Sequence, residues 1–406
     1  MLWQELKKIW RPGMVLMLLV LGFVFYAMYL EGNITYFPAD AYGDGELRVA
    51  ADWMDRYGTT ISPEEMAEIE ANVSGLLREA DEAIAANRLA QEIGLRDWKD
   101  YQNYLDTWYH TASGTLEGEA WERYTECCQL INYVQGEETG NIDGRLYATQ
   151  VLSERYRCWQ REQIHFHTAE YDQGYSSREL EHFTQFFAGD AWQNILPAQV
   201  PEVTSRYFAY LLVWMVLSAG LLVSVVPVRD RLRGMTETQW SSKRGRRWEQ
   251  SRFGAAMLSA FGLTLGNLAI FGGIFLTNGT LQFGQCRLFS FMDTGFSWAN
   301  WTYGNWWMML VLMCLVMTMA FAALAYLLAR GSGNYIAMLL KLLPLFVVGA
   351  LCSVATIDRA FYVQNSLYQM THLPYIEGMV TGVILGIAGG CCLIGWRRVR
   401  KAELNT

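Results

Sequence analysis

The stretch VRDRLRGMTETQWSSKRGRRWEQSRF, from Val228 to Phe253, separates two long apolar runs of the chain. Between these two residues, positions 229–252 carry eight lysine and arginine side chains and three acidic ones. A protein core does not hold so many charges, because each unpaired ion loses its hydration there. Basic charge between two apolar runs instead indicates a loop kept at one membrane surface.

The composition agrees with a membrane protein. Of the 406 residues, 52% are hydrophobic and 18% are charged, so the chain is more apolar than an ordinary soluble domain. A helix needs ~20 mostly apolar residues to cross a bilayer. The candidate spans are 14–30, 207–228, 253–277, 306–328, 335–356 and 376–396. The sequence therefore predicts an all-α polytopic membrane protein with six transmembrane helices.

Charge is divided unevenly along the chain. Residues 31–205 carry 32 acidic and 12 basic side chains, a net charge of −20, against 8 acidic and 20 basic elsewhere, a net charge of +12. The basic segments are the N-terminus, the 229–252 loop, the 329–334 link and the 397–406 tail. With six spans all four lie on one side, which the positive-inside rule makes cytoplasmic. We therefore expect a plasma-membrane protein with both termini inside, an extracytoplasmic domain at 31–205, and outer loops at 278–305 and 357–375.

The first span has two interpretations. A basic flank before an apolar core is also typical of a cleavable signal peptide, but no small-x-small cleavage site follows 14–30. We interpret this span as a retained anchor. Residues 1–12 place Leu2, Leu6 and Ile9 on one helical face and Lys8 toward the other, which predicts a short helix in the membrane interface. A frayed basic N-terminus is the alternative.

The predicted outer domain has a mainly helical pattern. Ser62 and Pro63 are typical of a helix N-cap and first helical residue, and apolar residues then recur at helical spacing. Further helical patterns cover 98–109, 116–134, 143–159 and 177–187.

Four cysteines lie in predicted outer segments, where disulfides are permitted. Cys127, Cys128, Cys158 and Cys286 allow three pairings that sequence cannot choose between, although we favour Cys158 with one of the adjacent pair. Aromatic residues fill the 278–305 loop, and we interpret them as an interfacial belt. Stacking on a substrate is the alternative.

Motifs for chemistry are absent from the sequence. It contains no Walker A motif and no serine or cysteine hydrolase elbow. His165 and His167 would face the same way on a strand and could bind a metal, although a surface pair is the simpler interpretation. Lys341 is the one ionisable residue well inside a span, and its stem is long enough to reach the surface. We therefore expect no enzymatic activity, no bound cofactor or metal, and no ion relay of the kind that ion-coupled carriers use.

The last span carries glycine at every fourth position. Such a stripe lets another helix backbone approach closely, either inside the bundle or in a dimer. The four residues are Gly378, Gly382, Gly386 and Gly390.

The basic loop itself is more than a run of charge. Leu232, Met235, Trp240 and Trp248 stand among its charges, which favours a short structured helix that docks on a partner. A purely topological anchor is the alternative.

The order of these features resembles the membrane subunit of ABC-2-type ABC transporters. That family has a near-interfacial first helix, a first span followed by a large outer insertion, five more spans, and a charged loop after the second span. The loop residues that carry the resemblance lie in VRDRLRGMTETQWSSKRGR. In such permeases a charged cluster with a glycine ends the second span, and a basic stretch leads into the third. The resemblance makes these residues candidates for ATPase coupling: Arg229, Asp230, Arg231, Arg233, Gly234, Trp240, Lys243, Arg244, Gly245 and Arg246.

The resemblance implies the permease subunit of an ATP-driven exporter. Its partners would be a cytoplasmic ABC ATPase, which holds ATP and Mg²⁺, a second permease subunit in a homodimer or heterodimer, and the lipid bilayer, with no nucleic acid. The rival hypothesis is a membrane-bound sensor or receptor whose extracytoplasmic domain binds a ligand.

Overall fold

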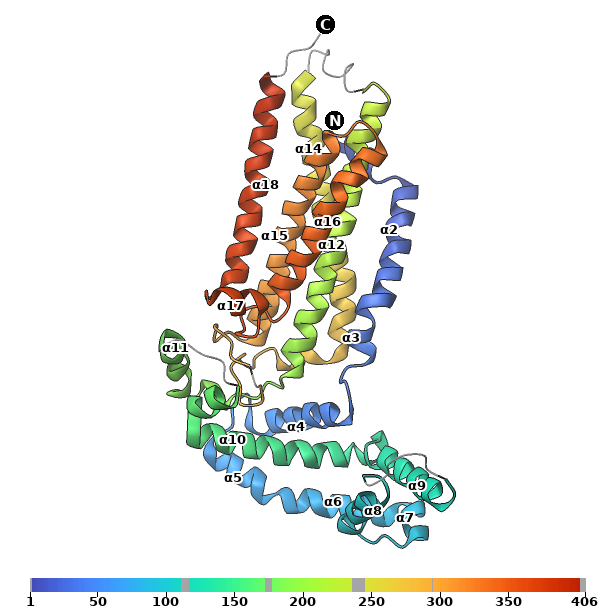
Figure 1. The fold of residues 1–406 in the computed structure, drawn as a ribbon, viewed down its shortest axis with the longest axis vertical. Coiled ribbons are helices and arrows are strands. Elements are labelled where there is room, and N and C mark those ends of the chain that lie inside the picture. Colours follow the sequence, from blue (N-terminus) through green and yellow to red (C-terminus); the bar gives the residue numbers. More distant parts are fainter. Residues whose placement is uncertain (1, 111–116, 172–176, 236–244, 294, 402–406) are drawn as a thin grey trace. The chain divides into compact units, whose positions relative to one another are not determined.

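The computed structural model describes residues 2–110, 117–171, 177–235, 245–293 and 295–401 (Figure 1). Within these ranges the elements are all helices. The chain divides into two compact units. The helix bundle comprises Met1–Phe37, Val200–Gly284 and Gly295–Thr406, and the helical domain comprises Pro38–Gln199 and Gln285–Thr294.

The bundle contains the predicted spans. Six helices of the described chain are long and apolar enough to cross a membrane, and each includes one of the six predicted segments. This confirms an all-α polytopic membrane protein. Its elements are α1 (Leu2–Ile9), α2 (Pro12–Phe25), its π-helical continuation η1 (Tyr26–Leu30), α3 (Gly32–Thr35), α12 (Gln199–Leu232), α14 (Gly245–Phe275), η4 (Leu276–Asn278), η5 (Thr280–Phe283), α15 (Tyr303–Arg330), α16 (Tyr335–Ile357), α17 (Ser366–Thr371) and α18 (Ile376–Lys401).

Helix α12 is the core of the bundle. Its apolar window is 78% buried, against 17% for the span of α2 and 11% for α18. Glycines bring neighbouring helices close: a Cβ on Gly220 would lie 2.5 Å from a ring carbon of Phe346, and one on Gly349 would lie 2.9 Å from Val216. The outer helices instead expose apolar side chains, as helices do where they face lipid. Prolines interrupt two of the spans, Pro227 in α12 and Pro344 in α16.

The helical domain is built from shorter helices. They are α4 (Ala41–Tyr57), α5 (Pro63–Ala71), α6 (Val73–Ala86), α7 (Arg88–Ile93), α8 (Trp98–Trp108), α9 (Glu119–Val134), η2 (Glu137–Thr139), α10 (Ile142–Tyr171), α11 (Ser177–Phe187) and η3 (Ala191–Gln193). Ser62 forms the predicted cap, reinforced by Glu65 in a capping box. The pattern that follows is divided into three helices, because Asn72 and Asn87 occupy the helix ends. The four later helical patterns are confirmed as α8 to α11.

Helices α4 and α10 approach closely enough for their backbones to touch. A Cβ on Gly45 would lie 2.1 Å from the carbonyl carbon of Gly144. Asn141, which precedes α10, accepts a hydrogen bond from the Gly144 N–H and donates to Asp44 of α4 at 2.9 Å. Only residues without a side chain fit at this crossing, and the amide of Asn141 fixes its register.

The aromatic loop differs from the prediction. Phe289 and Phe291 are fully buried in the helical domain, where Phe289 contacts Trp159 and Phe291 contacts Tyr156. The backbone of residues 285–293 also bonds to the domain, since the Phe291 N–H donates to the Trp192 carbonyl at 2.8 Å. The prediction of an interfacial belt is therefore wrong for these two rings, because they fill a protein core.

Two further expectations are corrected. All eight cysteines lie within the described residues and each is a free thiol, so the favoured pairing of Cys158 does not form; Cys286 instead lies 3.7 Å from the sulfur of Met54. The segment with His165 and His167 belongs to helix α10 rather than to a strand. Residues two apart on a helix do not share a face, and the side chains of this pair lie outside the described residues.

We predict that Gly45→Ala destabilises the helical domain. The added methyl group must push α4 away from α10, and overpacking of this kind costs ~1–3 kcal/mol or more. Hydrogen exchange measured by mass spectrometry on the full chain should show faster exchange in both helices. Gly75→Ala is the matched control, because a Cβ there meets nothing within 4 Å and alanine favours a helix by ~1 kcal/mol. Equal protection in parent and Gly45→Ala chains would contradict the packing argument.

Candidate functional site

The described part of the basic loop begins and ends in helices. Arg229, Asp230 and Arg231 belong to the last turn of α12. Arg233 and Gly234 follow, and Gly234 has a positive φ of 63°, which ends the helix. Gly245 and Arg246 begin α14. Trp240, Lys243 and Arg244 lie outside the described residues.

A buried ion-pair cluster lies where the loop leaves the bundle. Arg252 of α14 pairs with Asp230 of α12 at 3.5 Å and with Glu249, one turn earlier on α14, at 2.9 Å. The three side chains are only 3–4% exposed. Buried charges need partners of opposite sign, because transfer out of water costs several kcal/mol per ion.

Helix α15 completes the cluster. The Tyr326 hydroxyl accepts a hydrogen bond from Arg252 Nε at 3.1 Å and donates to Glu249 at 3.2 Å. Arg330 adds an ion pair with Glu249 at 3.3 Å. Two guanidinium groups thus balance two carboxylates. We call Asp230, Glu249, Arg252, Tyr326 and Arg330 the helix-end cluster; it joins α12, α14 and α15 at one end of the bundle.

The N-terminal helix is attached beside this cluster. Trp248 lies between two cations, with Lys8 of α1 5.4 Å and Arg252 4.7 Å from the ring. Arg229 donates a hydrogen bond to the Lys8 carbonyl at 3.1 Å, and Lys8 pairs with the buried Glu5 at 2.7 Å. Helix α1 is therefore held by both ends of the loop.

The link between α15 and α16 is held in the same way. Arg231 donates to the Ser332 carbonyl at 3.2 Å, and the Lys341 amine reaches the Gly331 carbonyl at 3.0 Å. This confirms that the Lys341 stem extends to the end of the bundle. Among the predicted coupling residues, the structure brings Arg229, Asp230 and Arg231 into these contacts.

Sequence reasoning missed most partners in the helix-end cluster. Glu249 and Arg252 stand three residues apart, just before a long apolar run, and that spacing places them on one helix face. It could have indicated an ion pair at the membrane boundary. Tyr326 carried no such signal, because it lies inside an apolar span.

The glycine stripe of α18 is not used inside this bundle. A Cβ built on Gly378, Gly382, Gly386 or Gly390 meets nothing within 4 Å in the described chain. Gly395, farther along α18, does face a neighbour, since its Cβ would lie 3.3 Å from Leu327. The packing interpretation is therefore wrong for these four glycines, and the dimer interpretation stays a prediction.

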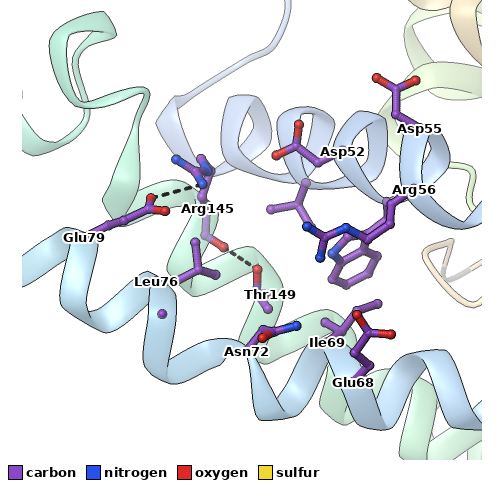
Figure 2. Close-up of a pocket in the computed structure, with 13 residues that line it drawn as sticks. Asp52, Asp55, Arg56, Glu68, Ile69, Asn72, Leu76, Glu79, Arg145 and Thr149 are labelled. Atoms are coloured by element: carbon purple, nitrogen blue, oxygen red, sulfur yellow. Dashed lines mark hydrogen bonds and ion pairs between the residues drawn. The ribbon is translucent and has the colours of Figure 1, made fainter.

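The helical domain has an acidic groove (Figure 2). Its volume is about 870 Å³, and helices α4, α5, α6 and α10 supply its walls. Four carboxylates and two arginines line it; Arg145 pairs with Glu79 at 3.3 Å. Asp52, Asp55 and Glu68 make no ion pair within the described residues. The groove thus favours cations over anions.

Comparison with known proteins gives no match: no protein-family model, no curated protein and no solved structure is significantly similar to this chain. Among the described residues, no group of three histidine, cysteine or acidic side chains could hold a metal ion. The class established by the fold is that of a multi-pass, all-α membrane protein.

We predict that Arg252→Met is strongly destabilising. It leaves two buried carboxylates with one guanidinium, and breaking a buried ion pair costs ~3–5 kcal/mol. Thermal unfolding of the full chain in detergent should show a clearly lower unfolding temperature for the variant than for the parent. The double variant Asp230→Leu with Arg252→Met keeps Glu249 and Arg330 as a balanced pair, so it should be more stable than the single variant. Equal stability of the two variants would contradict the charge-balance argument.

A second prediction concerns Glu46, which is half-buried on α4. Burial raises its pKa to about 7; Arg155 opposes this shift, and Asp293 and Asp40 add to it. Between its ordinary pKa of 4.5 and this value, the folded chain holds a proton that the unfolded chain has lost. Stability should therefore fall as pH rises through this window.

Glu46→Gln removes this penalty. The variant should match the parent in thermal unfolding at pH 4.5 and exceed it at pH 8, by ~1–2 kcal/mol after discounting for partial exposure. A variant that is less stable than the parent at pH 8 would contradict the assignment.

Proposed function

We propose that this chain is the permease subunit of an ATP-driven exporter, coupled through residues 229–252 to a separate ABC ATPase. The helix-end cluster is the observation that supports the proposal. It joins three spans at the two points where the loop enters and leaves the bundle. A force applied to the loop would therefore move α12, α14 and α15 together, rather than one helix alone.

Other features agree with this proposal. The sequence has no Walker A motif, so ATP and Mg²⁺ would be held by the partner chain. Arg252 and its partners lie at the ends of their helices, not in a relay across the spans. By the positive-inside rule, the proposed exporter would have its basic loop and both termini in the cytoplasm and its helical domain outside the plasma membrane. Two copies of the bundle would form one pathway, and the open glycine face of α18 offers a surface for the second copy.

A receptor is the second candidate function. The acidic groove of the helical domain supports it, because an open groove of that size can hold a ligand. In this alternative the helical domain binds a cationic ligand outside the cell, and the loop recruits a cytoplasmic partner. Ligand-dependent signalling in cells that lack any ATPase partner would favour it over the exporter.

The exporter proposal predicts the behaviour of a loop variant. Trp240→Ala with Arg244→Ala should insert and express normally, because seven of the eight loop bases remain to hold the loop inside. Loss of an aromatic anchor and a charged contact at an interface costs ~2 kcal/mol or more, so ATP hydrolysis stimulated by the permease should fall. The measurement is ATPase activity of the complex reconstituted in vesicles, with the ATPase taken from an adjacent reading frame that encodes a Walker A motif.

The matched control is Arg78→Ala with Trp121→Ala. It removes the same residue types from exposed positions of the helical domain, and stimulated hydrolysis should match the parent. If the Trp240 and Arg244 variant binds the ATPase and stimulates it like the parent, the loop is only a topological anchor. If no ATPase co-purifies with the parent chain, the exporter proposal fails.

A further inference from the structure

The helical domain contains a second cavity, lined mainly by aromatic rings. It has a volume of about 580 Å³ and lies among helices α4, α8, α9 and α10. The lining includes one tryptophan and four tyrosines, from α4, α8, α10 and the residue that follows α8: Tyr42, Trp98, Tyr101, Tyr109 and Tyr147. Its size falls within the range of small-molecule sites in proteins.

The rings are arranged in tilted pairs. Tyr42 of α4 and Tyr147 of α10 have centroids 4.7 Å apart at 52°, and Trp98 and Tyr101 of α8 have centroids 4.8 Å apart at 41°. The face of an aromatic ring carries partial negative charge and attracts a cation. A cage of several rings can therefore replace part of the hydration of an organic cation.

The charged side chains that line the cavity are carboxylates, and one histidine, His110, lines it as well. Asp106 and Asp143 are among the lining residues that the structure describes, and none of those residues is lysine or arginine. Asp143 is half-buried and accepts a hydrogen bond from Gln135 at 2.8 Å. Burial raises its pKa, and the Gln135 bond opposes the shift. A carboxylate with so little water around it gains from a cation placed beside it.

Two buried donors of the cavity have no partner. Tyr101 is 1% exposed and Trp98 is 5% exposed, yet neither the Tyr101 hydroxyl nor the Trp98 indole N–H makes a hydrogen bond within the described chain. Both donor atoms are covered by protein atoms, so a ligand would meet the aromatic rings and carboxylates of the cavity rather than these two donors.

We propose that this cavity binds a quaternary ammonium compound, with the ammonium group among the tyrosine rings near Asp143. A quaternary ammonium group suits the cage because it donates no N–H hydrogen bonds and binds through charge and ring contact alone. The inference rests on the cavity and not on the proposed export function, and it can hold whether or not an ATPase binds the loop.

The test is calorimetric titration of the full chain in lipid nanodiscs with choline as the probe. Its neutral isostere 3,3-dimethylbutan-1-ol has the same shape and hydroxyl but no charge. Choline should bind saturably below ~10 mM, and the isostere should bind ~10-fold more weakly or not at all. Absence of saturable choline binding, or equal binding of the two, would overturn the proposal.

Variants locate the site. Asp143→Asn keeps an oxygen that can accept from Gln135 but removes the charge, so choline affinity should fall ~10-fold. Asp190→Asn, at an exposed position of the same domain that lines neither this cavity nor the acidic groove, is the matched control and should bind choline like the parent. Loss of affinity in both variants alike would overturn the assignment to this cavity.

Asp143 also lies in the first turn of α10, so its removal could impair folding. Tyr42→Leu and Tyr147→Leu then decide the question, because both rings are about half exposed, at 44% and 51%, and the domain should tolerate their loss. Each should weaken choline binding without changing thermal unfolding in the absence of choline. Parent-like affinity in both would overturn the proposal.

Discussion

The guanidinium of Arg252 is the group on which the order of the helix ends depends. It lies between the carboxylates of Asp230 and Glu249, where almost no water reaches any of the three. The two acids come from different helices, and Arg330 ties the second of them to a third. The same ion pairs that balance the buried charges also fix the register of the three helices. If one helix slid along another, the charges would be separated where water cannot reach them.

The helical domain is organised by a different constraint. There the closest contact is steric and involves no charge, since the backbones at Gly45 and Gly144 touch. Asn141 supplies the specificity through hydrogen bonds to both helices. The bundle can expose apolar side chains to lipid on its outer faces, whereas the helical domain must bury its apolar side chains within itself. The buried Phe289 and Phe291 show that part of this core comes from a loop distant in the sequence.

The sequence predicted the spans well because length and hydropathy alone determine whether a helix can cross a membrane. It also predicted the cap at Ser62 and the helical character of the residues after it, but not the helix ends at Asn72 and Asn87. Helix α4 was not predicted: its residues mix glycine and acids, and the reason for the glycine lies in a helix about 100 residues away. The helix-end cluster was predicted only in part for a similar reason. Asp230 stood out in the loop, but its pairing with Arg252 across two spans is a tertiary contact, which local pattern does not encode.

The α12 backbone is weakest beside the cluster. Pro227 lies one turn before Asp230 and has no N–H to donate. The carbonyl of Val223, four residues earlier, therefore lacks its helical hydrogen bond. Gly254 stands just beyond Arg252 in α14, where a glycine lowers the cost of distorting a helix. Helices α12 and α14 therefore each have a residue that makes bending easier close to the ion pair between Asp230 and Arg252. The last turns of these spans are thus linked to one another by ion pairs, while the hydrogen-bonded backbone that continues α12 into the bundle is incomplete at Pro227.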